Sequence, residues 1–296
     1  MAERALEVRA VGPQVTVQDL GRAGHAHLGV PHSGALDAPA HRLANRLVGN
    51  DESAATLECL GGQLSFRTRT AVTIAVTGAR VPVTVEGRGQ DWGNAVSVPA
   101  ESLVELGAVT EGLRAYLAVS GGIEVEPVLG SRSTDLLSGL GPEPVGDGDV
   151  LSLGEPVRSP VAVEAVRIPR PSRELRLRLG PRDDWFDASS VEALDGASYV
   201  VGSASNRIGL RLEGEPIRWR DDQELPSEGM VLGGVQVPPN GQPVVFLNDH
   251  PTTGGYPVVG VVVADDLAVC AQLRPGDRIT LRVTPRVTPR VTPRVA

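Results

Sequence analysis

The chain has 296 residues, and its 36 acidic and 28 basic side chains give a formal net charge of −8 at pH 7. All 28 basic side chains are arginine, which excludes a lysine Schiff base, a P-loop of the GKS or GKT type and a biotinylated lysine in this chain. The acidic balance and the 3% aromatic content also argue against nucleic-acid binding.

The remaining composition indicates many short strands. With 35 glycines and 24 prolines the chain is rich in turn-forming residues, without being of low complexity. Cys59 and Cys270 lie far apart and show no metal-type spacing, so we expect two buried thiols. No segment has the pattern of a signal peptide or a membrane span, and we expect a cytoplasmic protein with no membrane association.

A helix is the first element that the pattern indicates clearly. One face collects the apolar residues Leu36, Ala40, Leu43, Ala44 and Leu47. Ser33 or Asp37 can cap its N-terminus, and Gly49 suits the left-handed position after its last turn.

Strands follow it. Residues 72–77 and 81–85 alternate apolar and polar side chains on either side of Gly78, which predicts a hairpin with its turn at that glycine. Further along the chain we expect strands at 116–119, 175–179 and 244–247 and a second, weaker helix at 265–272.

A short internal repeat suggests two lobes. The sequence GDVLSL at 148–153 resembles GDRITL at 276–281, and each would close one half of the chain. We therefore expect an N-terminal lobe over 1–160, a proline-rich linker over 161–172 and a C-terminal lobe over 173–283. The RVTP repeats of residues 284–296 should form a disordered tail, either without function or as a basic docking arm.

Three polar, glycine-rich segments could bind a ligand. In the first, residues 18–37, Arg22 offers a planar fork for a carboxylate or phosphate, and Asp19 could hold its guanidinium group. The alternative is an Asp–Arg pair that only fastens the loop. The second, residues 130–135, places Ser131 and Arg132 after a glycine turn, as an anion cradle or as a capping turn.

The third segment, residues 236–257, holds the densest set of functional groups. Asp249 and His250 could form an acid–base pair, although neighbours on a strand need not touch. Thr252, Thr253 and Tyr256 could bind a carbonyl or carboxylate group. The other four histidines, His25, His27, His32 and His41, show no ligand spacing, so no metal site is predicted.

Together these segments resemble a family of biotin-dependent carboxyltransferase-like proteins, the C-type subunits of 5-oxoprolinase, also called allophanate hydrolase subunit 2. The similarity runs in order through VQDLGRAGHAHLGVPHSGALD, LANRLVGN, LGSRST, NRIGLRLEG and LNDHPTTGGYP. It implies a mainly β fold, two cyclophilin-like β-barrel lobes with a few short helices.

The resemblance also implies a function shared with partners. The first expectation is one component of a heteromeric 5-oxoprolinase, which opens 5-oxoproline to glutamate with ATP bound at the level of the complex and with A-type and B-type proteins as partners. The alternatives are a carboxyltransferase component served by biotin on a separate carrier, and a non-catalytic regulator that binds a B-type partner. Under the first two, Arg22, Ser131, Arg132, Arg207, Thr252, Thr253 and Tyr256 would bind the substrate or an anion, and Asp249 and His250 would exchange protons.

Overall fold

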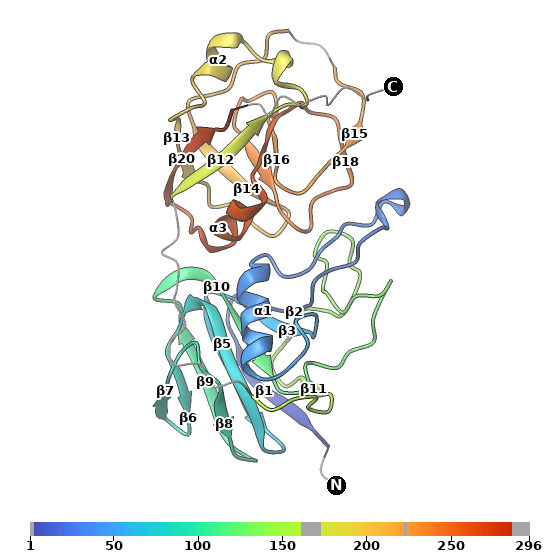
Figure 1. Cartoon of the computed structure of the whole chain (residues 1–296), viewed down its shortest axis with the longest axis vertical. Coiled ribbons are helices and arrows are strands. Elements are labelled where there is room, and N and C mark those ends of the chain that lie inside the picture. Colours follow the sequence, from blue (N-terminus) through green and yellow to red (C-terminus); the bar gives the residue numbers. More distant parts are fainter. Residues whose placement is uncertain (1–2, 161–172, 222–223, 286–296) are drawn as a thin grey trace, which may run out of the picture.

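A computed structural model describes residues 3–160, 173–221 and 224–285 of the chain (Figure 1). The molecule is mainly β, as predicted, with an N-terminal and a C-terminal lobe stacked along its long axis. The predicted linker, 161–172, lies outside the described residues, and so does the predicted tail except for Thr284 and Pro285.

The N-terminal lobe contains eleven strands in two sheets. The six-stranded sheet has the order β11-β1-β4-β9-β6-β7 and the five-stranded sheet the order β2-β3-β10-β5-β8. The strands are β1 (Ala5–Val11), β2 (Gln14–Gln18), β3 (Thr56–Leu60), β4 (Gly62–Thr68), β5 (Val72–Arg80), β6 (Val83–Val85), β7 (Arg88–Gln90), β8 (Val96–Val98), β9 (Leu103–Ala108), β10 (Glu111–Val119) and β11 (Val150–Ser152). Side chains from both sheets, among them Phe66, Ile74 and Leu117, share one buried core.

The C-terminal lobe is a closed barrel of seven strands, in the order β12-β19-β16-β17-β14-β13-β20. These are β12 (Glu174–Leu179), β13 (Ser198–Val201), β14 (Gly209–Gly214), β16 (Gly234–Gln236), β17 (Val244–Phe246), β19 (Val258–Val262) and β20 (Arg278–Val283). A two-stranded sheet, β15 (Glu228–Gly229) with β18 (Thr253–Gly254), lies beside the barrel. The barrel core contains Leu175, Leu177 and Val245, which confirms the predicted strands at 175–179 and 244–247.

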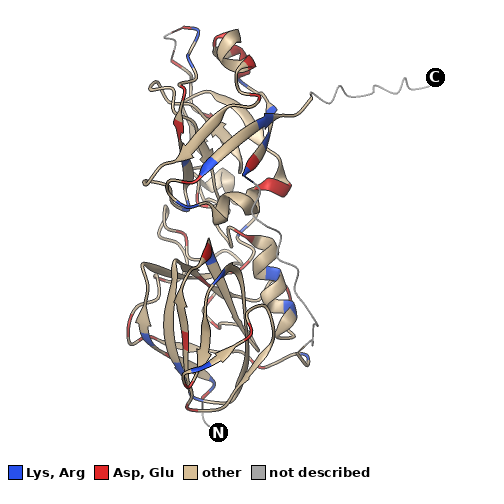
Figure 2. Ribbon diagram, turned by 90° about the vertical axis from the view of Figure 1, so that its left-hand side faces the viewer, with Lys and Arg blue, Asp and Glu red and all other residues tan. Residues whose placement is uncertain are grey.

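Helices are short and few in the described residues. They are α1 (Ala38–Leu47), α2 (Ala188–Glu192), α3 (Leu267–Gln272) and the 3₁₀ helices η1 (Ala26–Leu28), η2 (Asp183–Trp185) and η3 (Ala264–Asp266). Of the two predicted caps of α1, Asp37 is the one used, since its Oδ1 atom accepts a hydrogen bond from Ala40 N at 3.0 Å. Gly49 adopts the expected left-handed conformation, with φ +79°. The basic residues Arg42 and Arg46 of α1 (blue in Figure 2) have side chains that are about half exposed, and each pairs with Glu52.

The predicted hairpin around Gly78 is wrong. Strand β5 continues through Gly78 to Arg80 and pairs with β8 and β10, whereas β6 belongs to the other sheet and pairs with β7 and β9. Gly78 has φ +75° and lies so close to β10 that a Cβ atom there would come within 2.6 Å of the Arg114 carbonyl oxygen. The glycine therefore serves a close approach of two strands and not a turn.

The two lobes meet through polar contacts of α3 with β10. Gln272 Nε2 donates to Asp37 Oδ2 at 2.8 Å and to the Arg114 carbonyl at 3.0 Å. Arg114 Nη1 donates in return to the Ala271 carbonyl at 2.8 Å. Leu36, from the N-terminal lobe, packs into the barrel core, so the junction is both apolar and hydrogen-bonded.

The buried imidazole of His41 on α1 should make stability depend on pH. Its Nδ1 lies 2.9 Å from Thr56 Oγ1 and its Nε2 3.0 Å from the Glu52 carbonyl, and burial lowers its pKa from 6.5 to about 4. Between about pH 4 and pH 6.5 this histidine is therefore more protonated in the unfolded chain than in the folded protein. The free energy of unfolding falls as the pH drops below 6.5. Between pH 7 and pH 5 we expect a loss of about 2 kcal/mol from this group.

Urea unfolding of the wild type and of His41→Gln at both pH values measures this loss. The variant should lose less stability on acidification than the wild type, and the exposed His27→Gln should behave as the wild type does. Equal acid sensitivity of all three proteins would contradict the assignment to His41.

Candidate functional site

The three polar segments singled out in the sequence converge at the junction of the two lobes. Ser33 N donates to the Asn248 carbonyl at 2.9 Å, which joins the first segment to the third. The Asn248 side-chain amide donates to the carbonyls of Ser33, Gly34 and Ala35. Leu136 N, just after the second segment, donates to Asp249 Oδ2 at 3.2 Å. The loops lie together beside the junction in Figure 1.

Asp19 organises the first two segments. Its Oδ1 atom accepts hydrogen bonds from Gly21 N at 2.8 Å and from the hydroxyls of Ser131 and Ser133 at 2.6 Å each. Its Oδ2 atom accepts from Arg132 N at 2.6 Å. The hydroxyl of Ser131, predicted to bind an anion, is thus already engaged by a carboxylate of the chain, while the Arg132 side chain donates from Nε to the Val125 carbonyl at 2.9 Å.

Arg22 is buried in this loop and does not pair with Asp19 as predicted. Its Nη2 donates to the Ser133 carbonyl, and its Nη1 lies 3.9 Å from Asp135 Oδ2. Asp19 accepts hydrogen bonds from four other donors instead. Burial lowers the pKa of Arg22, and Asp135 and Asp19 oppose that shift.

Arg207 stands at the centre of a buried ionic cluster. Its Nε and Nη2 atoms donate to the two oxygens of Asp249 at 2.8 and 2.9 Å, its Nη1 donates to Glu58 Oε1 at 2.7 Å, and Nη2 also reaches the Gly34 carbonyl. Each guanidinium nitrogen of Arg207 therefore donates to the protein. These bonds fasten β3 to the third segment and leave the predicted anion-binding role of Arg207 without a nitrogen that is free of protein partners.

Glu58 on β3 is the member of this cluster that sequence patterns did not reveal. Its Oε2 atom accepts from the Tyr116 hydroxyl at 2.8 Å and from Leu36 N at 3.1 Å, and Arg114 Nε lies 3.4 Å from Oε1. Burial raises the pKa of Glu58, but the guanidinium groups of Arg207 and Arg114 outweigh it, and the net shift is downward. The one feature of the sequence that could have pointed to Glu58 is that it is the only carboxylate in the otherwise mostly apolar segment TLECL.

Asp249 and His250 do not form the predicted pair. Asp249 is fully buried and bonded to Arg207, whereas the His250 ring stacks on Phe246 with a centroid distance of 5.6 Å. His250 Nδ1 contacts the Pro251 carbonyl at 2.8 Å. The two residues follow the end of β17 in a turn, and their side chains contact different partners.

Thr252, Thr253 and Tyr256 lie at the surface of the third segment. Thr252 is half-buried, Thr253 is exposed on β18, and the Tyr256 ring, 44% exposed, leans on Trp219 with a centroid distance of 6.3 Å. Unlike Arg207, these three side chains lie where a ligand can reach them, and their binding roles stay predictions.

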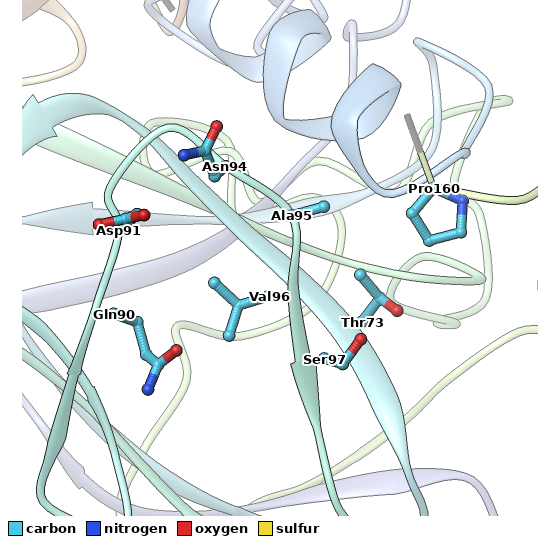
Figure 3. A pocket seen from close by; sticks show the side chains of 8 residues that line it. All are labelled: Thr73, Gln90, Asp91, Asn94, Ala95, Val96, Ser97 and Pro160. Atoms are coloured by element: carbon cyan, nitrogen blue, oxygen red, sulfur yellow. The ribbon is translucent and has the colours of Figure 1, made fainter. Parts of the chain in front are cut away.

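A cavity of about 510 Å³ opens beside β5 and β8 in the N-terminal lobe (Figure 3). Its lining residues are Thr73, Gln90, Asp91, Asn94, Ala95, Val96, Ser97 and Pro160, and it contains none of the predicted site residues. Across the ranges that the structure describes, no group of three or more His, Cys, Asp or Glu residues could hold a metal ion.

Comparison with known proteins shows to which family the chain belongs. Residues 28–283 match the model of the family "Carboxyltransferase domain, subdomain A and B". The chain belongs to this family. The match includes the second and third segments and the second half of the first, residues 28–37.

Curated and solved relatives agree with the assignment. The chain is 39% identical to the C subunit of 5-oxoprolinase from Escherichia coli (strain K12), over 93% of this chain and 89% of that protein. It is 33% identical to a urea amidolyase of Lachancea kluyveri, over 93% of this chain but 17% of that protein. The crystal structure of TTHA0988 matches with a TM-score of 0.85 and 36% identity over 96% of this chain, which spans 56% of that chain.

Proposed function

We propose that this chain is one component of a heteromeric, ATP-dependent 5-oxoprolinase that opens the lactam of 5-oxoproline to give glutamate. The observation behind the proposal is the 39% identity to the C subunit of a 5-oxoprolinase, which extends over nearly the whole of both proteins. In the urea amidolyase relative the same unit is a small part of a much longer chain. Similar length and full coverage favour the separate subunit.

Because the relatives of similar length are named as C subunits, further subunits are implied, and we propose A-type and B-type partners in a cytoplasmic complex. The residues at the junction do not suit the phosphates of a nucleoside triphosphate. Arg22 and Arg207 are buried against protein groups, and the chain has no lysine. We therefore assign ATP to a partner and the junction loops to the lactam substrate. The expected contacts with a carboxylate or amide come from Thr252, Thr253 and Tyr256.

Reconstitution tests this proposal. The chain, purified with A-type and B-type proteins of the same organism, should release glutamate from 5-oxoproline only when ATP is added. Removing any one of the three should abolish the release. A complete complex that forms but leaves 5-oxoproline unchanged would contradict the proposal.

The family match and the urea amidolyase relatives favour a second candidate, a carboxyltransferase component. Because no lysine is present, biotin would have to arrive on a separate carrier. Transfer of the carboxyl group from carboxybiotin to urea or another amide by the same complex, without release of glutamate from 5-oxoproline, would support this candidate instead.

A further inference from the structure

The loop of residues 252–256 combines a tied backbone with three hydroxyl side chains that a ligand can reach. Its strand β18 pairs with β15, and Met230 N, which directly follows β15, donates to the Thr252 carbonyl oxygen at 2.9 Å. The side chains of Thr252, Thr253 and Tyr256 are half-buried or exposed. None of their hydroxyl groups makes a hydrogen bond to any residue that the structure describes. The loop therefore presents hydroxyl groups to a ligand from a backbone that is already ordered.

One buried side chain of the barrel supports this loop. Gln236, the last residue of β16, is 8% exposed, and its Nε2 atom donates to the Tyr256 carbonyl oxygen at 3.2 Å. The pairing of β16 with β19 shifts register between Val235 and Gln236. Shifts of this kind redirect a side chain and often occur beside functional sites. The Gln236 amide thus connects the barrel wall to the loop that carries the three hydroxyl groups.

Gly254 makes room for this amide. A Cβ atom at Gly254 would lie 2.8 Å from Gln236 Nε2 and 3.2 Å from Met230 Sδ. The φ angle of Gly254 lies outside the left-handed region, so its backbone conformation does not call for glycine. The missing side chain instead serves the close approach of the Gln236 amide to the loop.

We propose that Gln236 is a positioning residue that holds the 252–256 loop in the arrangement in which its hydroxyl groups bind the substrate. The inference rests on the proposed function for the identity of the substrate, and on contacts within the chain for the tether itself. A loop that is ordered before binding loses less conformational entropy when the ligand binds. Because its amide is bonded to the loop backbone, Gln236 should affect substrate binding and leave the chemical step nearly unchanged.

Gln236→Leu in the reconstituted complex tests this role. The variant should raise KM for 5-oxoproline about fivefold and keep kcat within about twofold of the wild type, since it removes one hydrogen bond of the loop. Leucine is similar in size to glutamine and can pack against Met230, so the variant should fold normally. Gly254→Ala should raise KM in the same way, because its methyl group would displace the Gln236 amide, which is the end of a flexible side chain.

The matched control is Gln242→Leu. Gln242 lies in the same segment, and its side chain also bonds backbone atoms, since Oε1 accepts from Gly214 N at 2.9 Å and Nε2 donates to the Gly214 carbonyl at 3.1 Å. These bonds hold the end of β14 and not the 252–256 loop. This variant should therefore leave both KM and kcat within about twofold of the wild type.

Amide hydrogen exchange of the full-length chain alone measures the tether without any activity. The Met230 amide, bonded to the Thr252 carbonyl, should exchange about fivefold faster in Gln236→Leu than in the wild type. The Leu212 amide of the barrel, bonded to the Pro243 carbonyl, should exchange in the variant at the wild-type rate.

The possible results separate the two proposals. Unchanged exchange of the Met230 amide in folded Gln236→Leu would overturn the tether. A KM within about twofold of the wild type in both Gln236→Leu and Gly254→Ala would overturn the positioning role. A wild-type complex that releases no glutamate would overturn the proposed function and the role of Gln236 toward that substrate, while the exchange result on the chain alone would still decide the tether.

Discussion

Glu58→Gln should destabilise the protein more than any other single charge change at the junction, by about 3 kcal/mol, because it leaves a buried guanidinium group without its counter-ion. Glu58 faces both Arg207 and Arg114, and all three side chains are buried. The amide of glutamine can still accept hydrogen bonds, but it carries no charge. The wild-type contribution is present above pH 4.5 and is lost as the pH falls through the lowered folded-state pKa of Glu58.

The matched control is Glu52→Gln. Glu52 also bonds an arginine, Arg46 at 2.6 Å, but both side chains are about half exposed. Removal of that pair should cost much less than the loss expected for Glu58→Gln, because water screens it. Urea unfolding of both variants at pH 7 measures the difference, and equal losses would show that the buried cluster does not stabilise the junction.

Gly141→Ala should be nearly as damaging, with an expected loss of about 3 kcal/mol from steric conflict and backbone strain together. A Cβ atom at Gly141 would lie 2.1 Å from the Ser133 carbonyl oxygen and 3.2 Å from Arg22 Nη2. Its φ of +86° is also one that alanine rarely adopts. The substitution would push apart the loop that holds Asp19 and Arg22.

Gly139→Ala measures the backbone-strain part of this loss, and the difference between the two variants gives the steric part. Gly139 has a similar φ of +70°, but nothing lies within 4 Å of a Cβ atom there. This variant should lose about 1 kcal/mol from backbone strain alone. If thermal and urea unfolding show the same loss for both alanines, the tight packing of Ser133 against Gly141 is not important for stability.

Local patterns predicted the regular elements well. The helix before Gly49 has its Asp37 cap and its left-handed glycine, because both depend only on neighbouring residues. The buried thiols Cys59 and Cys270 are confirmed, and burial raises the pKa of each to about 12. No helix within the described ranges has the length and apolar character to cross a membrane.

Local sequence patterns could not predict contacts between residues that are far apart in the chain. Gly78 has the sequence signature of a turn, yet its conformation is set by β10, more than thirty residues away in the chain. Arg207 has the chemistry of an anion binder, and only the fold places Glu58 and Asp249 against all of its nitrogens.

The family resemblance drew attention to these segments without giving the contacts within them. The hydrogen bonds of Ser33, Asn248 and Leu136 bring residues 18–37, 130–135 and 236–257 into one region. Buried Arg207 bonds Asp249 and Glu58 across the junction, whereas Thr252, Thr253 and Tyr256 are half-buried or exposed, and the binding roles of these residues stay predictions.

The most direct test of the central proposal is an omission assay with purified proteins. Glutamate formed and ATP consumed are measured together from 5-oxoproline, with the A-type and B-type partners present and this chain added or left out. The account predicts that glutamate forms with ATP consumption only when this chain is present. The same rate of glutamate formation without it would contradict the account.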